Sequence, residues 1–249
     1  MTDNSDEKSA PGTAKLPVKT IVVAVVVIAF MVIFKRELGG LLERTSDFKI
    51  STEGVVIKAV VKTVETPIGT TEVSVVPLAK SPQSSTGVHG TTYVNTEYAF
   101  QISWPNAKDW TPDEALGAQL HKKLGLPATV DIPIVILSNT PIDRFRPNIN
   151  VVVEKVGDMS IQDYMAATKD SLVAQGWEVL STSVDPKTRG GVIVFINNTG
   201  GERIYQFQRI AMNKGNAYVI TASQVPKADL SQGLKQGLGD IVNSFRVIQ

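Results

Sequence analysis

An uninterrupted run of apolar residues near the N-terminus, 21–34, constrains this chain more than any other feature of its sequence. The run reads IVVAVVVIAFMVIF. Counted from Leu16, and interrupted only by Pro17, Lys19 and Thr20, it would span ~28 Å as a helix, close to the ~30 Å hydrocarbon core of a bilayer. The sequence therefore predicts a single transmembrane helix over residues 16–36 that anchors the chain in a lipid bilayer.

Two alternatives for this run stay open. Buried core helices or strands also carry apolar runs, although no later segment of this chain has the same character. A cleaved signal peptide is the other alternative, but the run is long for one and the following KRELGG lacks an A-x-A cleavage pattern. The positive-inside rule leaves the orientation open, because basic residues on the two sides are almost balanced: Lys8, Lys15 and Lys19 before the run, and Lys35, Arg36, Arg44 and Lys49 after it.

Composition divides the rest of the chain into four parts. Residues 1–15 are polar and predict a disordered tail. Residues 37–76 predict a juxtamembrane stalk or small hairpin around Glu53, which could self-associate. Residues 77–92 are rich in Pro, Ser, Gly and Thr and predict a flexible linker. Residues 93–249 predict one folded domain, long enough to bury a sizeable core.

Within this domain, hydrophobic periodicity and turn residues predict alternating strands and helices. Ser160 and Asp163 form a capping pattern before a helix that ends near Gly176. Short turns between four later strands imply an antiparallel meander, so the predicted fold class is α+β, an antiparallel sheet flanked by helices. The predicted strands are 98–104, 132–137, 148–154, 178–184, 192–197, 203–212, 217–223 and 245–248, and the other predicted helices are 112–125 and 227–242.

Three segments resemble PsbP-like domains, a superfamily that includes the Ran-binding Mog proteins and actinobacterial lipoproteins. They are EYAFQISWPNAKDW, NINVVVEKVGDMSIQDYMAATKDSL and DIVNSFRV, and the resemblance covers residues 93–249. It implies an α/β/α sandwich, with residues 107–129 as an insertion. It also implies binding of proteins, and places the domain outside the cytoplasm with the N-terminus inside. The metal binding of some PsbP proteins does not carry over, because no matching ligand residues are found.

Composition excludes several kinds of chemistry. The chain has no cysteine, which removes disulfides, thiolate catalysis and zinc–cysteine sites. Its two histidines, His89 and His121, show no metal-ligand spacing, so we expect neither a metal site nor a cofactor. The G-x-S-x-G elbow and glycine-rich phosphate loops are missing. We therefore expect no catalytic residues and no enzyme, with a hydrolase-like or small-ligand site assembled by folding as the alternative.

The remaining candidate site is a short basic and aromatic cluster, Arg144, Phe145 and Arg146. Arginine and aromatic residues are enriched where proteins bind each other. The alternative, which the sequence favours, is a solvated loop whose Phe145 packs in the core. The chain has a net charge of only +1, and its basic and acidic side chains balance from residue 91 onward, which argues against a nucleic-acid partner. The sequence therefore predicts a membrane-anchored, single-pass binding or assembly module that presents its domain to a protein partner.

Overall fold

The computed structural model describes residues 63–66, 69–73, 85–142, 145–198, 203–225 and 231–248. The predicted tail 1–15, the predicted transmembrane helix 16–36 and the expected hairpin around Glu53 lie outside these residues. Within the part of the chain that the structure describes, no helix combines the length and the apolar character needed to cross a membrane.

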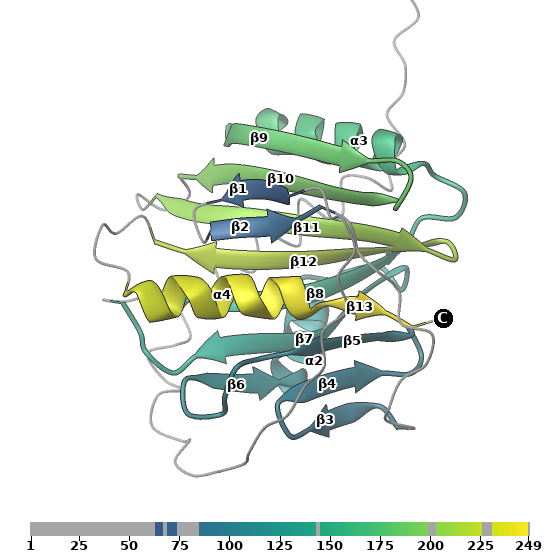
Figure 1. Cartoon of the computed structure of the whole chain (residues 1–249). Coiled ribbons are helices and arrows are strands. Elements are labelled where there is room, and N and C mark those ends of the chain that lie inside the picture. Colours follow the sequence, from purple (N-terminus) through teal and green to yellow (C-terminus); the bar gives the residue numbers. More distant parts are fainter. Residues whose placement is uncertain are drawn as a thin grey trace, which may run out of the picture.

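A seven-stranded antiparallel sheet forms the centre of the molecule (Figure 1). Its last four strands in the chain form the meander that the sequence predicts, each pairing with the one before it. In order across the sheet, the strands are β6 (Trp110–Asp113), β7 (Val130–Ser138), β8 (Asn148–Lys155), β12 (Asn216–Gln224), β11 (Ile204–Asn213), β10 (Gly190–Asn197) and β9 (Glu178–Asp185).

Both faces of this sheet are buried, and alternate residues along a strand enter different cores. In β8, Val152 packs into the first core, whereas its neighbours Val151 and Val153 pack into the second. This alternation is the two-residue period of a β-strand. A nearly continuous apolar strand is expected where both faces are covered, and β8 and β10 have this character.

The helices α2 (Glu114–Lys123) and α3 (Ile161–Ala174) cover the first core. Ser160 caps α3 as predicted, because its side chain accepts a hydrogen bond from the Asp163 amide. Gly176 follows the helix with φ +77°, a left-handed conformation that glycine adopts without strain. Local signals in the sequence therefore placed α3 correctly.

The second core has a mixed cover of one helix and a small sheet (Figure 1). The helix is α4 (Gln232–Ser244), which packs on β8 and β12. Beside it lies a four-stranded antiparallel sheet in the order β13 (Arg246–Val247), β5 (Phe100–Ser103), β4 (Thr92–Asn95) and β3 (Gly87–His89). The α+β class is confirmed, and this second sheet is an addition to the single sheet that the sequence predicted.

Two predicted boundaries need correction. The linker predicted over 77–92 overlaps β3 and the start of β4, whose ladder pairs Gly87 with Val94. The helix predicted over 112–125 begins only at Glu114, because Pro112 belongs to β6 at the edge of the large sheet, where its missing amide hydrogen is tolerated. In both places the composition of the segment does not predict a strand. The short strand forms because it pairs with a neighbouring strand, β3 with β4 and β6 with β7.

A further hairpin, β1 (Thr63–Thr66) and β2 (Gly69–Glu72), lies within the predicted stalk. It packs against α4, on the same face of the large sheet (Figure 1). The residue after it, Val73, is fully buried in the second core. The folded unit therefore includes part of the segment that the sequence assigned to the stalk, and starts before the predicted boundary at residue 93.

Candidate functional site

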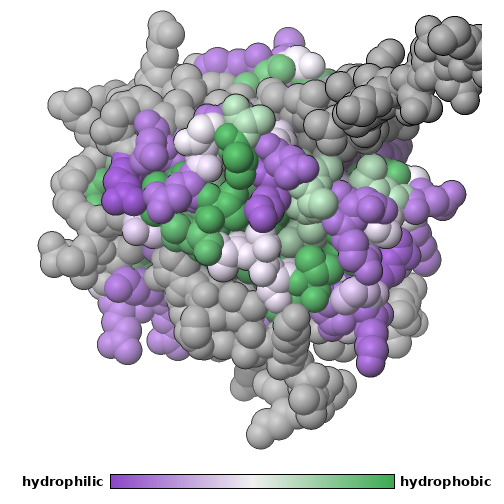
Figure 2. All heavy atoms as spheres, turned by 90° about the horizontal axis from the view of Figure 1, so that it is seen from above, coloured by the Kyte–Doolittle hydropathy of each residue, from purple (hydrophilic) through white to green (hydrophobic). Residues whose placement is uncertain are grey.

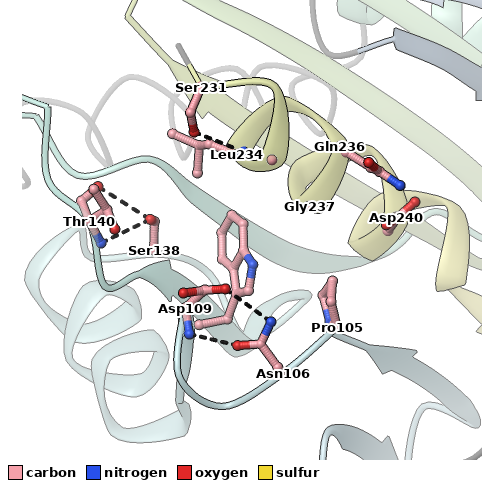
Figure 3. Close-up of a pocket in the computed structure, with 12 residues that line it drawn as sticks. Pro105, Asn106, Asp109, Ser138, Thr140, Ser231, Leu234, Gln236, Gly237 and Asp240 are labelled. Atoms are coloured by element: carbon pink, nitrogen blue, oxygen red, sulfur yellow. Dashed lines mark hydrogen bonds between the residues drawn. The ribbon is translucent and has the colours of Figure 1, made fainter.

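A cleft of about 370 Å³ lies between α4 and the segments that flank β6 (Figure 3). This volume is at the lower end of the range for small-ligand sites and is large enough for one or two side chains of a partner. The α4 wall is formed by Ser231, Gly233, Leu234, Gln236, Gly237 and Asp240, and the facing wall by Pro105, Asn106, Asp109, Trp110, Ser138 and Thr140.

Hydrogen bonds hold the β5–β6 turn in the shape that forms the facing wall. The Asp109 amide donates to Asn106 Oδ1 at 2.8 Å, and Asn106 Nδ2 donates to Asp109 Oδ2 at 3.0 Å (Figure 3). This reciprocal pair is typical of turns in which an Asn side chain binds the backbone a few residues on. It positions the Asp109 carboxylate at the cleft.

Asn139 and Arg146 support this turn from behind. The amide of Asn139 donates to the Asp109 carbonyl at 2.8 Å, and its Nδ2 donates to the Lys108 carbonyl at 2.9 Å. Arg146 in turn donates to the Ser138 carbonyl and, at 3.1 Å, to Asn139 Oδ1. Arg146 is therefore a positioning residue for the cleft wall.

The charged groups that line the cleft are both acidic. Asp109 and Asp240 lie on opposite walls, and among the residues that the structure describes the lining includes no Lys, Arg or His. Partial burial raises the pKa of Asp240 above that of a free carboxyl group, because desolvation disfavours the charged form. An approaching cation would relieve this cost, so the cleft favours a positively charged ligand.

The two serine hydroxyl groups of the cleft are bonded to backbone groups. Ser231 Oγ accepts from the Leu234 amide as the N-cap of α4, and Ser138 Oγ bonds to the Thr140 amide and carbonyl (Figure 3). Among the described residues, no group of three or more His, Cys, Asp or Glu side chains could hold a metal ion. This arrangement is suited to hydrogen bonding and to the recognition of charge.

The structure describes two of the three residues that the sequence proposed as a partner site. Arg144 lies outside the described residues, and Phe145 is buried in the first core, the alternative weighed for it from the sequence. Arg146 is half-buried, and burial lowers the pKa of its guanidinium group. Binding of a partner by this cluster stays a prediction, and the described contacts give Arg146 a role behind the cleft.

The cleft residues themselves were missed by sequence analysis. They come from three segments, 105–110, 138–140 and 231–240, which meet only in the folded chain. The one signal for the turn was the Pro105–Asn106 pair after a predicted strand, which is typical of a loop and not of a site. Asp240 carries no signal of its own, since it is a single polar residue on an amphipathic helix.

A second surface lies at the β9 edge of the large sheet and on α3 beside it. Leu180 of β9 and Val173 of α3 are large apolar residues that are about half exposed, at 45% and 54%. The face seen from above mixes apolar and hydrophilic side chains closely (Figure 2). Scattered apolar residues of this kind are normal on soluble surfaces, so they do not define a site.

No family model and no curated protein matches this chain. Its solved structural relatives include cyanobacterial PsbP (CyanoP) from Synechocystis sp. PCC 6803, at 16% identity and a TM-score of 0.44 over 67% of this chain and 98% of that one. A variant of Mog1 is similar at 12% identity and a TM-score of 0.40, over 64% of this chain and 96% of Mog1. LpqN of Mycobacterium tuberculosis, described as involved in cell envelope biogenesis, is similar at 13% identity and a TM-score of 0.35, over 64% and 99% of the two chains. The resemblance to PsbP-like and Mog proteins recognised in the sequence is thus found again in the structure, as a likeness of fold alone.

Proposed function

We propose that this chain is a membrane-anchored, non-catalytic binding and assembly module, and that the cleft beside α4 receives a basic segment of a protein partner. The observation that carries this proposal is the charge of the cleft: Asp109 and Asp240 line its opposite walls, and none of the other described residues in the lining is charged. Opposite charges at complementary surfaces steer association and select the partner.

The polar groups around the two carboxylates fit the same kind of partner. Gln236, Ser231 and Thr140 line the cleft and can hydrogen-bond to a peptide backbone or to a guanidinium group. Leu234, Pro105 and the Trp110 indole provide apolar surface for the methylene stem of Lys or Arg. The methylene stem of a basic side chain would contact the apolar residues of the lining, and its charged end would bind the carboxylates on the two walls.

Membrane anchoring by residues 16–36 completes the proposal. A tether keeps the domain near a membrane-bound partner and raises its effective concentration, so a shallow cleft suffices for occupancy. We place the domain on the extracytoplasmic side. We expect the full chain to remain in membranes washed with carbonate. A chain that starts at residue 37 should be released from them. Protease protection of residues 93–249 in sealed spheroplast-derived vesicles of known orientation tests the side of the membrane.

The cleft is tested with two fluorescent peptides of equal length and apolar content, one carrying Lys and Arg and the other Asp and Glu. We expect binding of the basic peptide only, weakened by raising the salt concentration because exposed charges are screened. The double variant Asp109→Asn, Asp240→Asn should weaken this binding about tenfold or more, whereas the matched control Asp158→Asn, Asp170→Asn removes two exposed carboxylates elsewhere and should not. Equal binding of both peptides, or equal loss in both variants, would contradict the proposal.

A small-ligand or enzymatic role is the alternative, and the same chain tests it. The full chain incubated with generic ester and phosphoester substrates should show no turnover above that of the Asp109→Asn, Asp240→Asn variant. Turnover that depends on these two carboxylates would replace the binding proposal with a catalytic one.

A further inference from the structure

The last turn of α4 is held by two arginine side chains from neighbouring strands. The last four carbonyl groups of an α-helix have no α-helical partner, and cations near that end are stabilising. Nη1 of Arg209, on β11, donates to the Val242 carbonyl at 3.0 Å. Nη1 of Arg246, on β13, donates to the Phe245 carbonyl at 2.8 Å and also to the Asn243 carbonyl. The position of this helix end therefore depends on where the two guanidinium groups lie.

Glu72, at the end of β2, holds Arg209 in place. Arg209 is fully buried, and its Nη2 lies 3.5 Å from Oε2 of Glu72. Burial, together with the nearby Arg246, lowers the pKa of the Arg209 guanidinium to about 10, while Glu72 acts in the opposite direction. Removing the carboxylate of a buried ion pair is strongly unfavourable for the charge that remains. Loss of the Glu72 charge should therefore weaken the hold of Arg209 on the Val242 carbonyl.

The backbone around Glu72 makes a second contact with α4. The Glu72 amide donates to Asn243 Oδ1 at 3.2 Å, and Thr71 and Val73 on either side are fully buried. The hairpin of β1 and β2 that carries these residues shares no ladder with the two larger sheets in the described part of the chain. A two-stranded hairpin is marginally stable by itself. Residues 71–73 can therefore undock from α4 without breaking a ladder of the larger sheets.

The same helix carries one wall of the cleft. Asp240 comes three residues before Asn243, and residues three apart are neighbours on a helix surface. Neither Glu72 nor Arg209 is among the described residues that line the cleft. The hairpin packs on one side of α4, and β6 with the cleft lies on the other (Figure 1). Undocking of the hairpin would leave space on the far side of α4, into which the helix would move, and this motion separates Asp240 from Asp109.

We propose that the docking of residues 71–73 regulates the cleft, and that Glu72 is the positioning residue through which it acts. With Glu72 docked, α4 is held against the facing wall, and the Asp109 and Asp240 carboxylates bind one basic side chain together. When residues 71–73 undock, the two carboxylates act separately and the affinity falls. This inference rests on the proposed binding of a basic segment by the cleft. Because coupling between two sites is reciprocal, a bound basic peptide also stabilises the docked hairpin.

A double-mutant cycle on the full chain, purified in detergent, tests this coupling with the fluorescent basic peptide described above. Glu72→Gln removes the charge and keeps the size of the side chain. We expect it to weaken peptide binding at least about fivefold in the wild-type background but less than about twofold beside Asp240→Asn, because α4 then has no cleft carboxylate to position. Partial unfolding, or the loss of a distant negative charge, would lower the affinity by the same factor in both backgrounds.

The matched control for this cycle is Glu178→Gln. It removes the carboxylate of an exposed ion pair with Arg203 at the far edge of the large sheet, where no contact with α4 is involved. It should change the affinity for the basic peptide by less than about twofold, since exposed charges are screened by salt. A loss as large as that of Glu72→Gln would show that only the net charge of the chain matters and would overturn the proposal.

A second measurement follows α4 without any peptide. Trp110 lies against Gly237 of α4, whereas Trp177 belongs to the first core. In the full chain labelled with 5-fluorotryptophan, Glu72→Gln should shift the fluorine resonance of Trp110, assigned with Trp110→Phe, and leave that of Trp177 in place. An unchanged Trp110 resonance, or an equal loss of affinity in the two backgrounds, would overturn the proposal. A wild-type chain that does not bind the basic peptide would instead overturn the proposed function, and the Trp110 resonance would still report whether Glu72 positions α4.

Discussion

Gly237 of α4 and Trp110 of β6 approach so closely that a Cβ atom on residue 237 would lie 2.9 Å from Cζ2 of the indole and 3.0 Å from its Nε1. Real side chains do not come this close, so the helix can pack here only because position 237 has no side chain. Trp110 is 3% exposed and forms part of the cleft lining. The glycine therefore determines both the depth of the second core and the shape of the cleft.

Gly237→Ala should destabilise the fold by about 1–3 kcal/mol, since overpacking of the core outweighs the roughly 1 kcal/mol that alanine gains in a helix. The matched control is Gly233→Ala in the same helix, where a Cβ would meet nothing within 4 Å. That change should be neutral or stabilising. Urea unfolding followed by tryptophan fluorescence measures both, and equal effects of the two substitutions would count against the close contact.

Glu154→Gln should make the stability of the protein less dependent on pH. Glu154 is buried on β8 and accepts a hydrogen bond from the Tyr164 hydroxyl at 2.9 Å. Burial raises the pKa of its carboxyl group from 4.5 to about 7. The folded state thus favours the protonated acid, and the wild-type chain loses stability as the pH rises from about 4.5 through 7.

Because Gln is neutral and retains an acceptor for Tyr164, its advantage over Glu154 should be small at pH 4.5 and reach about 2–3 kcal/mol at pH 8. Denaturant unfolding at several pH values gives this difference. Glu178→Gln, which removes an exposed carboxylate paired with Arg203, is the control and should change stability by less than about 0.5 kcal/mol. A constant difference between wild type and Glu154→Gln across this range would show that Glu154 is not desolvated.

Removal of residues 63–84 should destabilise the domain, although these residues precede the boundary predicted at residue 93. A chain that starts at residue 85 loses the buried Val73 and the carboxylate of Glu72 beside Arg209. Burial of a Val side chain alone stabilises by about 1.5–3 kcal/mol. We expect the chain from residue 85 to be at least about 2 kcal/mol less stable than the chain from residue 63, measured by chemical denaturation. Identical midpoints would mean that residues 63–73 add nothing to the fold.

Gly117 and Gly191, which lie next to residues of the first core, should differ in how well they tolerate substitution by alanine. A Cβ on Gly117 of α2 would collide with the Ile132 backbone carbonyl, whereas a Cβ on Gly191 of β10 would lie 2.5 Å from Sδ of Met165. A methionine side chain can rotate away and a strand carbonyl cannot. Gly117→Ala should therefore cost more than Gly191→Ala, by about 1 kcal/mol or more in thermal or urea unfolding. The reverse order would show that α2 shifts on the sheet more easily than Met165 repacks.

Local signals predicted the C-terminal half of the fold well. The meander of β9 to β12 and helix α3 were placed from the alternation of apolar residues, the Ser160 cap and the turn residues between strands. Each of these signals involves only a few neighbouring residues, so it can be recognised in the sequence without the tertiary structure. The strands β3, β4 and β6 were missed for the opposite reason, because each is short and depends on a partner strand for its hydrogen bonds.

The sequence by itself determined the α+β class, the antiparallel order of the meander and the apolar run 21–34, because hydrophobic periodicity and turn chemistry are local properties. Only the tertiary structure decided where the site lies. Asp109 and Asp240 are far apart in the chain and meet across a cleft that a glycine leaves open, and Glu72 meets Arg209 across most of the domain. Such pairs depend on how α4 packs on the two sheets, and long-range packing is the sum of many weak contacts that no single segment encodes.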